Sequence, residues 1–269
     1  MLGAVSSRSL ASMLEVPQNQ NQVDIAVFGG SGFYSFVENL REVEIQTPYG
    51  PPSEMPRVGQ LGDRTIAFIP RHGSEHQIPA HRVNYRANLW AMAALGAKVC
   101  VAPFACGSLR PDFDRGDLVF VDQIIDRTHS RDGTFHDGPE TFHLPFADPY
   151  DTTLRSELAA VARNRGLRVH DSGTVVVIPG PRFSSRAESQ WHRAMGADLV
   201  NMTQAPEAAL AGELGLRYVG IAMVTDFDAG LEGDPNIGAV TEEEVYAFLH
   251  SNADSIRGVL VEGLPTLTL

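Results

Sequence analysis

From residue 23 onward, short apolar runs alternate with longer segments in which apolar residues recur every three or four positions. The apolar runs have the length of strands and lead into small, polar or charged residues, as expected for strands buried on both faces of a sheet. They cover residues 24–30, 64–70, 98–104, 174–180 and 217–226. The segments with helical spacing cover residues 82–97, 148–166, 184–196, 205–215 and 241–264. This alternation predicts an α/β fold.

Shorter runs add strands to this pattern. Residues 41–47, 57–62 and 64–70 are separated by polar turns, which predicts short antiparallel strands. Residues 117–125 and 197–202 are expected to form one further strand each. Parallel and antiparallel neighbours would then share a mixed central β-sheet flanked by helices.

One domain accounts for the chain from residue 23 to residue 269, because no repeat and no linker divides it. Residues 1–22 end in the polar stretch PQNQNQ and are predicted to form a disordered tail. This N-terminus lacks the sustained apolar core of a secretory signal peptide. No apolar stretch reaches the about 18 residues that a membrane span needs.

The chain of 269 residues has a formal net charge of −12 and a pI near 5.1. This charge argues against a protein that binds nucleic acid through a basic surface. We therefore expect a cytoplasmic protein with neither a nucleic-acid nor a membrane partner. Cys100 and Cys106 are expected to be reduced thiols, although their number leaves one disulfide open.

The first strand leads into FGGSGFY, residues 28–34. Glycine turns after strands often expose backbone N–H groups to phosphate. Ser35 and Phe33 occupy positions where a dinucleotide fingerprint and a nucleophile elbow each require glycine. The segment is therefore either an anion-binding loop with Ser31 as a hydroxyl donor or a plain turn.

The strand at 64–70 leads into RHGSEH, residues 71–76. His72 and His76 have the spacing of a helical zinc pair, but Gly73 and Pro79 argue against a helix there. Arg71 beside His72 suits an anion better, since a guanidinium matches the geometry of phosphate. A surface turn with polar residues is the alternative.

Three more strand ends carry small, hydroxyl or aromatic side chains. Cys106 in ACGSLR is a structural thiol rather than a nucleophile, because no base is evident beside it. Phe183 in GPRFSSRAES stacks on a flat ring or belongs to the core. VNMT contributes Asn201, Met202 and Thr203. Since ligands of open α/β sheets collect at strand ends, these segments together predict one pocket.

Asp226 and Asp228 follow the last strand in TDFDAG. Side chains two apart on an extended strand share a face, so the two acids are expected to point the same way. The alternative is a solvated acidic turn.

Seven segments, taken in order, resemble the trimeric nucleoside phosphorylases, and within that family the members that cleave 5′-methylthioadenosine. They are GGSGF, RHGSEHQIPAHRVNYRANLWA, ACGSLR, GDLVFVDQIIDRT, GPRFSSRAES, VNMT and TDFD. The resemblance runs from Asp24 to about Leu264 and implies the α/β nucleoside phosphorylase fold.

The resemblance implies phosphorolysis of S-methyl-5′-thioadenosine to adenine and 5-methylthioribose 1-phosphate. Inorganic phosphate would be the co-substrate, with no metal and no organic cofactor, and the enzyme would be a homotrimer. A purine nucleoside phosphorylase of broader 6-amino or 6-oxo specificity is the alternative. A hydrolase, or a binding protein that has lost turnover, is a further rival.

The resemblance also implies roles for single residues. Arg71 and His72 would act in catalysis with Asp226, which protonates or hydrogen-bonds purine N7, and Asp228, which selects the 6-amino group. The implied phosphate ligands are Ser31, Arg71, His72, the Ala105 backbone and Thr203. The implied substrate-binding residues are Phe104, Phe183, Ser184, Asn201, Met202, Val245, Glu242, Asp226, Asp228 and His143, the last lent to a neighbouring subunit.

This sequence departs from the family pattern at three places. Phe104 stands where the family has a threonine that donates to phosphate. Glu242 stands where the family has a small apolar residue near the 5′-alkylthio group, and a buried carboxylate there would cost desolvation. The chain ends at Leu269, without the longer tail of animal members. These departures bear on substrate breadth rather than on the reaction.

Overall fold

A mixed sheet forms the centre of the molecule. The computed structural model describes residues 14–30, 39–139, 141–230 and 238–269. Its strands are β1 (Ile25–Gly29), β2 (Arg41–Glu42), β3 (Arg57–Leu61), β4 (Arg64–Pro70), β5 (Val99–Ser108), β6 (Leu118–Phe120), β7 (Gln123–Asp126), β8 (Val169–His170), β9 (Thr174–Val177), β10 (Leu199–Asn201) and β11 (Arg217–Asp226). Its α-helices are α1 (Tyr85–Ala94), α2 (Thr152–Asn164), α3 (Arg186–Ala194), α4 (Gln204–Glu213) and α5 (Glu242–Gly263).

The long strand β5 connects the parts of the sheet. It pairs in parallel with β1 and β11, and its last residues pair antiparallel with β10. On the far side of β1, β4 is parallel to β1, while β3 and β4 form the predicted antiparallel pair. The prediction of a mixed central sheet is therefore confirmed.

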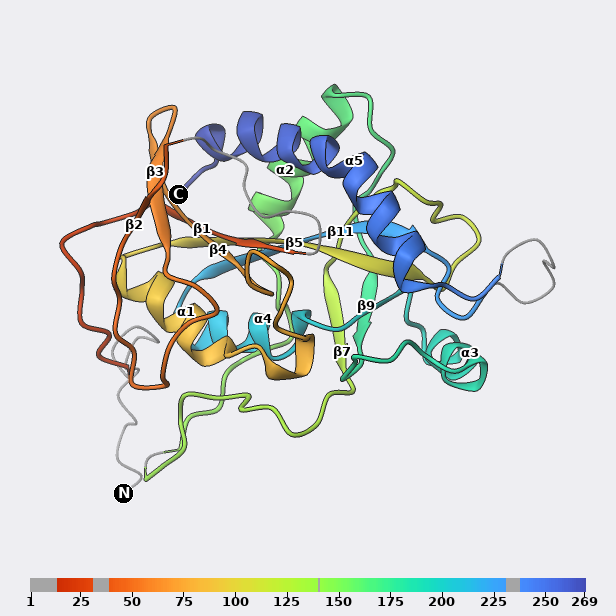
Figure 1. Ribbon diagram of the computed structural model, residues 1–269, viewed down its shortest axis with the longest axis horizontal. Coiled ribbons are helices and arrows are strands. Elements are labelled where there is room, and N and C mark those ends of the chain that lie inside the picture. Colours follow the sequence, from red (N-terminus) through yellow and green to blue (C-terminus); the bar gives the residue numbers. More distant parts are fainter. Residues whose placement is uncertain (1–13, 31–38, 140, 231–237) are drawn as a thin grey trace, which may run out of the picture.

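Alternate residues of the central strands face two separate helical layers (Figure 1). Ile25 and Val27 of β1 pack in the cluster that includes residues of α2 and α5. Ala26 and Phe28 pack in the cluster that includes residues of α1 and α4. Both faces of the strand are thus covered, which explains why its sequence is apolar without alternation.

Side chains fix where the helices begin. Asn84 accepts a hydrogen bond from the Ala87 N–H at the start of α1, and Asp151 does the same for Leu154 at the start of α2. Ser185 with Glu188, and Thr241 with Glu244, form capping boxes at α3 and α5. Such caps satisfy N–H groups that have no partner within the helix.

Residues 117–125, predicted to be one strand, form two. β6 pairs with β11 and β8, whereas β7 pairs with β9 on another part of the sheet. The chain changes partners between them, where Asp122 accepts a hydrogen bond from the Gly173 N–H. The run 41–47 is also shorter than predicted, with only the exposed β2 forming a ladder. An apolar pattern does not report which partner a strand pairs with.

The predicted tail, residues 1–22, stays a prediction, since residues 1–13 lie outside the described part. Leu14 and Val16 pack against the core, and the Asn19 N–H donates to the carbonyl of Ala94. Within the described ranges, no helix combines the length and the apolar character needed to cross a bilayer.

A buried ion pair joins the end of β4 to α4. Nε and Nη2 of Arg71 donate to the carboxylate of Glu207 at 2.6 and 2.8 Å, and both side chains are fully buried. The Tyr218 hydroxyl on β11 donates to the same carboxylate at 2.7 Å. Burial alone would lower the pKa of Arg71, but the ion pair with Glu207 raises it above its ordinary value. Arg71 is therefore a fixed cation.

We expect Arg71→Met and Glu207→Leu each to lower the free energy of unfolding by about 3–5 kcal/mol, because each leaves an unpaired buried charge. The double variant should recover most of that loss, since no charge then stays buried. Denaturant unfolding of the four proteins measures the coupling. Arg163→Met, which removes an exposed pair with Asp171, is the control and should change stability little. Additive losses in the double variant would contradict this view of the pair.

Candidate active site

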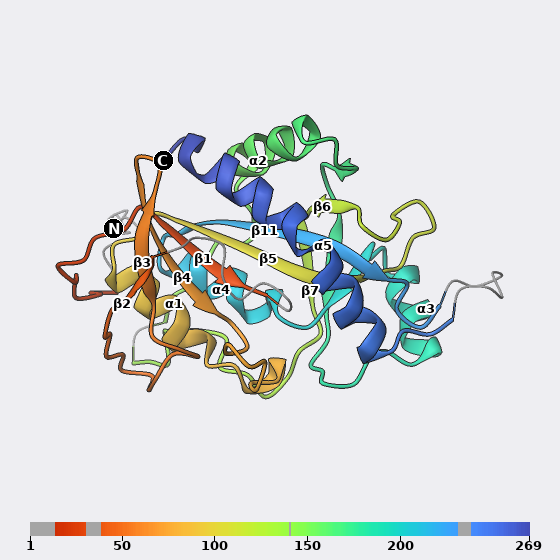
Figure 2. The same ribbon diagram turned by 45° about the horizontal axis from the view of Figure 1, so that its top comes forward.

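One cavity of about 350 Å³ gathers most of the predicted site residues. It lies at the carboxyl ends of the central strands, which point toward the side where α3 and the first turns of α5 lie (Figure 2). The predicted residues that line it are Arg71, His72, Phe104, Ala105, Phe183, Asn201, Met202, Thr203, Asp226, Asp228, Glu242 and Val245. The prediction for Ser31 falls outside the described residues.

Arg71 lines the cavity, and the Nε and Nη2 edge of its guanidinium is already bound to Glu207. Its Nη1 lies 3.5 Å from the carbonyl oxygen of Pro103. A Cβ on Gly30 would stand 2.8 Å from that oxygen and 3.4 Å from Nη1, so the turn after β1 can approach β5 only as glycine. One nitrogen of a rigidly held cation thus faces the turn that precedes Ser31.

His72 is a neutral imidazole. Burial and the nearby Arg71 charge lower its pKa to about 3. Its Nδ1 lies 2.9 Å from the carbonyl oxygen of Ile78, so Nδ1 carries the proton and donates it there. Nε2 is then an acceptor. His72 consequently suits a protonated oxygen of phosphate, toward which Nε2 can act as an acceptor.

Asn201 and Thr203 organise the end of β10. The Asn201 amide donates to the Ala105 carbonyl at 3.0 Å, and its oxygen accepts from the N–H groups of Thr203 and Gln204. The amide of Asn201 therefore joins β10 to β5 and caps α4. The Thr203 side chain is nearly buried and lines the cavity, with its hydroxyl 3.3 Å from Asn201 Oδ1.

Asp226 is held by an irregularity in the β5–β11 ladder. The register shifts between Val224 and Asp226, so Asp226 stands opposite Gly107. Bulges of this kind re-aim side chains beside active sites. Thr225 donates to Oδ2 at 2.7 Å and the Asp228 N–H donates to Oδ1 at 2.8 Å. Burial raises the pKa of Asp226, more than these two donors lower it. The acid is thus suited to carry a proton.

Asp228 does not lie on an extended strand, which corrects the geometric basis of the prediction. β11 ends at Asp226, and Asp228 has φ = +50°, in the left-handed region. Non-glycine residues adopt this region rarely, often at functional sites. Both acids line the cavity nevertheless. The cause is the turn after β11, in which the Asp228 N–H binds the Asp226 carboxylate, and not the alternation of side chains along a strand.

The loop before α3 brings Phe183 to the cavity wall near Met202. Ser184 does not line the cavity. Its hydroxyl is close to Asp228 and lowers the pKa of that carboxyl. Gly180 has φ = +66°, and a Cβ there would stand 2.6 Å from the Met202 sulfur. Glycine at this turn therefore lets Met202 occupy its place.

Phe104 is 3% exposed and belongs to the core cluster as well as to the cavity wall. Cys106 is a buried free thiol whose pKa burial raises well above its ordinary value. This environment makes Cys106 a packed thiol rather than a nucleophile, and Cys100 is likewise buried and free.

The first turn of α5 forms the rim of the cavity with the segment after β4. Glu242 is exposed, so it avoids the desolvation cost considered above. His76 stacks on His72 with ring centroids 4.6 Å apart and meets Tyr246 edge-on at 5.2 Å. Burial lowers the pKa of His76, and the Glu242 charge counteracts this. Among the described residues, no three His, Cys, Asp or Glu side chains form a metal site.

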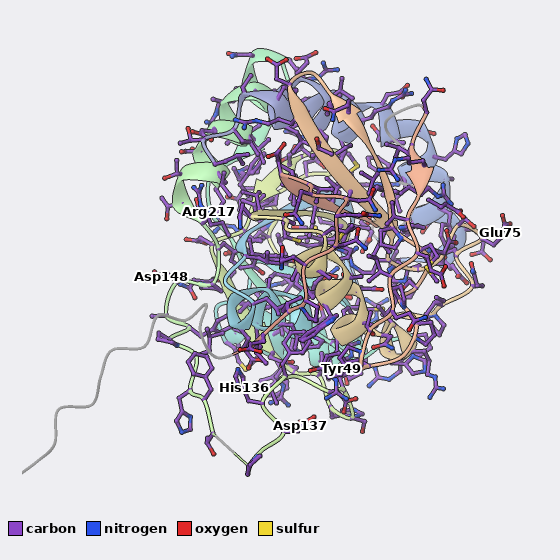
Figure 3. The ribbon with its side chains drawn as sticks, turned by 90° about the vertical axis from the view of Figure 1, so that its left-hand side faces the viewer. Tyr49, Glu75, His136, Asp137, Asp148 and Arg217 are labelled. Carbon is purple, nitrogen blue, oxygen red and sulfur yellow. The ribbon has the colours of Figure 1, made fainter. Side chains whose placement is uncertain are left out.

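His143 lies away from this cavity. It is exposed and is not among the lining residues. Figure 3 shows Asp148, on the same segment, and Glu75, on the segment that leads to the cavity, on opposite sides of the molecule. His143 is therefore not part of the cavity wall in its own chain.

Some residues of the site were not predicted from the sequence, and Glu207, Gly107, His76 and Tyr246 are among them. Glu207 lies in a helical segment whose pattern gives no hint of a buried acid. His76 was considered only as a metal ligand. Gly107 had a signal, since ACGS is a run of small residues at a strand end, and small residues there allow close approach of another segment.

Gly107 leaves room for the two acids. A Cβ at this position would stand 2.8 Å from Asp226 Oδ1 and 3.1 Å from the Asp228 backbone nitrogen. Gly107→Ala should therefore lower the free energy of unfolding by about 1–3 kcal/mol through overpacking. Gly133→Ala is the matched control, since its nearest contact would be 3.8 Å. Equal stabilities of the two variants in denaturant would show that the turn at Asp226 adapts freely.

Comparison with known proteins agrees with this geometry. A family model described as the phosphorylase superfamily matches residues 24–264. A purine nucleoside phosphorylase of Streptomyces coelicolor is 47% identical over 93% of this chain and 91% of its own. An S-methyl-5′-thioadenosine phosphorylase of Hyperthermus butylicus is 46% identical over 93% and 91%. The structure of a methylthioadenosine phosphorylase from Schistosoma mansoni with adenine aligns with a TM-score of 0.84 and 37% identity, over 91% of this chain and 92% of that chain. The chain therefore belongs to the phosphorylase superfamily and is an enzyme of the nucleoside phosphorylase class.

Proposed function

We propose that the protein cleaves S-methyl-5′-thioadenosine with inorganic phosphate, giving adenine and 5-methylthioribose 1-phosphate. The observation that carries the proposal is a cavity whose wall includes a fixed cation, Arg71, and two acids, the half-buried Asp226 and the buried Asp228. The names of the relatives from Hyperthermus butylicus and Schistosoma mansoni support this substrate.

The phosphate end combines three kinds of contact. Arg71 Nη1 supplies a charge-assisted donor, the Thr203 hydroxyl a neutral donor, and His72 Nε2 an acceptor for a P–OH group. Because Glu207 holds the guanidinium, little side-chain freedom is lost when phosphate binds. This combination of two donors and one acceptor favours binding of hydrogen phosphate over binding of an anion that has no proton to donate.

The base end assists departure of the purine. As phosphate oxygen bonds to the anomeric carbon, the bond from that carbon to N9 breaks and its electron pair stays on the base. Asp226 with a raised pKa can deliver a proton to N7 and so stabilise the leaving group. Asp228 as a carboxylate accepts a hydrogen bond from a 6-amino group. Phe183 offers an aromatic face beside them.

A second candidate is a purine nucleoside phosphorylase of broader specificity. The cavity rim carries Glu242, His76 and Tyr246, and these polar groups suit a 5′-hydroxyl at least as well as a methylthio group. The relative from Streptomyces coelicolor is named as a purine nucleoside phosphorylase. Adenosine is therefore the first competing substrate to compare.

We further propose a cytoplasmic homotrimer that needs no metal or organic cofactor. The exposed position of His143, remote from its own cavity, supports its donation to the site of a neighbouring subunit. Ser31, Asn201 and Val245 keep their predicted binding roles in this proposal, with Asn201 acting through the groups that it positions.

Phosphate dependence tests the proposal directly. We expect release of adenine from S-methyl-5′-thioadenosine only when phosphate is present, with 5-methylthioribose 1-phosphate as the second product. Adenosine and inosine in the same assay, followed by chromatography of the free base, separate the two candidate specificities. Equal release without phosphate would identify a hydrolase, and binding without release would identify a protein that has lost turnover.

Asp226→Ala should reduce kcat by about 100- to 10,000-fold with 6-amino and 6-oxo nucleosides alike, because it removes the proton donor at N7. The KM for phosphate should change far less, since Asp226 lies at the other end of the cavity. Steady-state kinetics with both substrates varied gives the two quantities. Glu243→Ala, an exposed acid next to Glu242, is the control. A variant with nearly full kcat would assign Asp226 to the turn alone.

A further inference from the structure

Four buried polar atoms at Asp228 lack a hydrogen bond of good geometry, although the hydroxyls of Ser184 and Ser189 lie close enough to Asp228 to lower the pKa of its carboxyl. The atoms are Asp228 Oδ2, Ser184 Oγ, Ser189 Oγ and His192 Nδ1. Buried polar groups in native proteins almost always have partners, so several unpaired ones around one carboxylate require an explanation. Ser189 and His192 have no role in the chemistry described above.

Helix α3 presents two of these groups to the carboxyl. Ser189 and His192 are three residues apart, the spacing of neighbours on one helix face, and are 2% and 3% exposed. Nη1 of Arg186 donates to the Ala229 carbonyl at 2.9 Å, which holds the start of α3 against the segment that carries Asp228. The helix is therefore fixed relative to the acid.

We propose that His192, together with the hydroxyls of Ser184 and Ser189, determines whether Asp228 is a carboxylate or a carboxylic acid, and thereby whether the pocket accepts a 6-amino or a 6-oxo purine. His192 is a positioning residue here, since it acts on the base through Asp228. The inference rests on the proposed function, because it assigns Asp228 to the 6-position of a bound purine.

The hydrogen-bonding capacity of the cluster differs between the two states of Asp228. As a carboxylate, Asp228 is an acceptor toward a 6-amino group and toward both serine hydroxyls, which pairs three of the four atoms. As an acid, it donates its proton to the oxygen of a 6-oxo group, and a serine hydroxyl can donate to its carbonyl oxygen. One site thus offers a matching partner for either base.

Burial and neighbouring groups shift the pKa values of Asp228 and His192 in opposite directions. Burial raises the pKa of Asp228, while the two hydroxyls and His192 lower it. Burial lowers the pKa of His192, the charges of Asp228 and Glu188 raise it, and Arg127 lowers it. The two pKa values therefore move toward each other, and the ionisation of each group affects that of the other.

Two charged groups near this end of the cavity act on Asp226. The Asp228 charge raises the pKa of Asp226, and Arg115 lowers it. Arg127 stacks over the Trp191 ring at 4.4 Å, beside His192. Ionisation of Asp226 alters N7 chemistry for both bases alike, so the ratio of activities on the two bases isolates the Asp228 state.

The test is the ratio of kcat/KM for S-methyl-5′-thioadenosine to that for S-methyl-5′-thioinosine, measured from pH 5 to pH 8.5 with saturating phosphate. In the wild type we expect the ratio to fall toward acid pH, by up to about tenfold per pH unit across the transition. His192→Phe removes a group that lowers the pKa of Asp228, so the transition should move to higher pH and the ratio at neutral pH should fall. Ser189→Ala should shift it in the same direction.

Two controls keep the outcome decisive. His250→Phe changes an exposed histidine of α5 and should leave the pH curve of the ratio where it is. His192→Gln keeps hydrogen bonding without a titrating ring, and it replaces His192→Phe if thermal unfolding shows that the phenylalanine variant does not fold. Identical curves for wild type, Ser189→Ala and a folded His192 variant would overturn the inference. Absence of phosphate-dependent base release in the wild type would instead overturn the proposed function.

Discussion

The buried pair of Arg71 and Glu207 is the interaction on which the site depends. It joins the end of β4 to α4, and Tyr218 brings a second strand, β11, into the same contact. A buried charge is tolerated only when it is paired and hydrogen-bonded, so this pairing lets a full cation stand at the wall of a cavity. That cation in turn helps to keep His72 neutral. The charge of Arg71 and the neutral state of His72 at the proposed phosphate site thus both depend on the ion pair between Arg71 and Glu207.

The opposite end of the cavity depends on close approach of two backbones. A bulge in β11 places Asp226 opposite Gly107, and the chain then turns through Asp228 in a left-handed conformation. Any side chain larger than hydrogen at position 107 would meet the Asp226 carboxylate. The two acids therefore owe their positions to a ladder irregularity that glycine permits.

Burial favours the uncharged form of a titratable group at each end of the cavity. It keeps His72 without a charge, so that the ring accepts rather than donates at Nε2, and it favours a proton on Asp226. These effects place a neutral imidazole and a carboxyl with a raised pKa in one cavity with a guanidinium that is always charged. In the proposed reaction, a cavity wall built in this way separates recognition of the anion from protonation of the leaving base.

The sequence by itself determined the fold class, most strands and helices, and the pocket residues at Arg71, His72, Met202, Thr203 and Asp226, because apolar periodicity and strand-end chemistry are local properties. The division of residues 117–125 into two strands came only from tertiary structure, since a pattern does not name the partner of a strand. The same holds for Glu207, which lies 136 positions from Arg71 along the chain, and for His192, whose role depends on the helix face turned toward Asp228. Contacts between distant segments, and the burial that results from them, decide the charge states of the site side chains. A local sequence pattern predicts neither the contacts nor the burial.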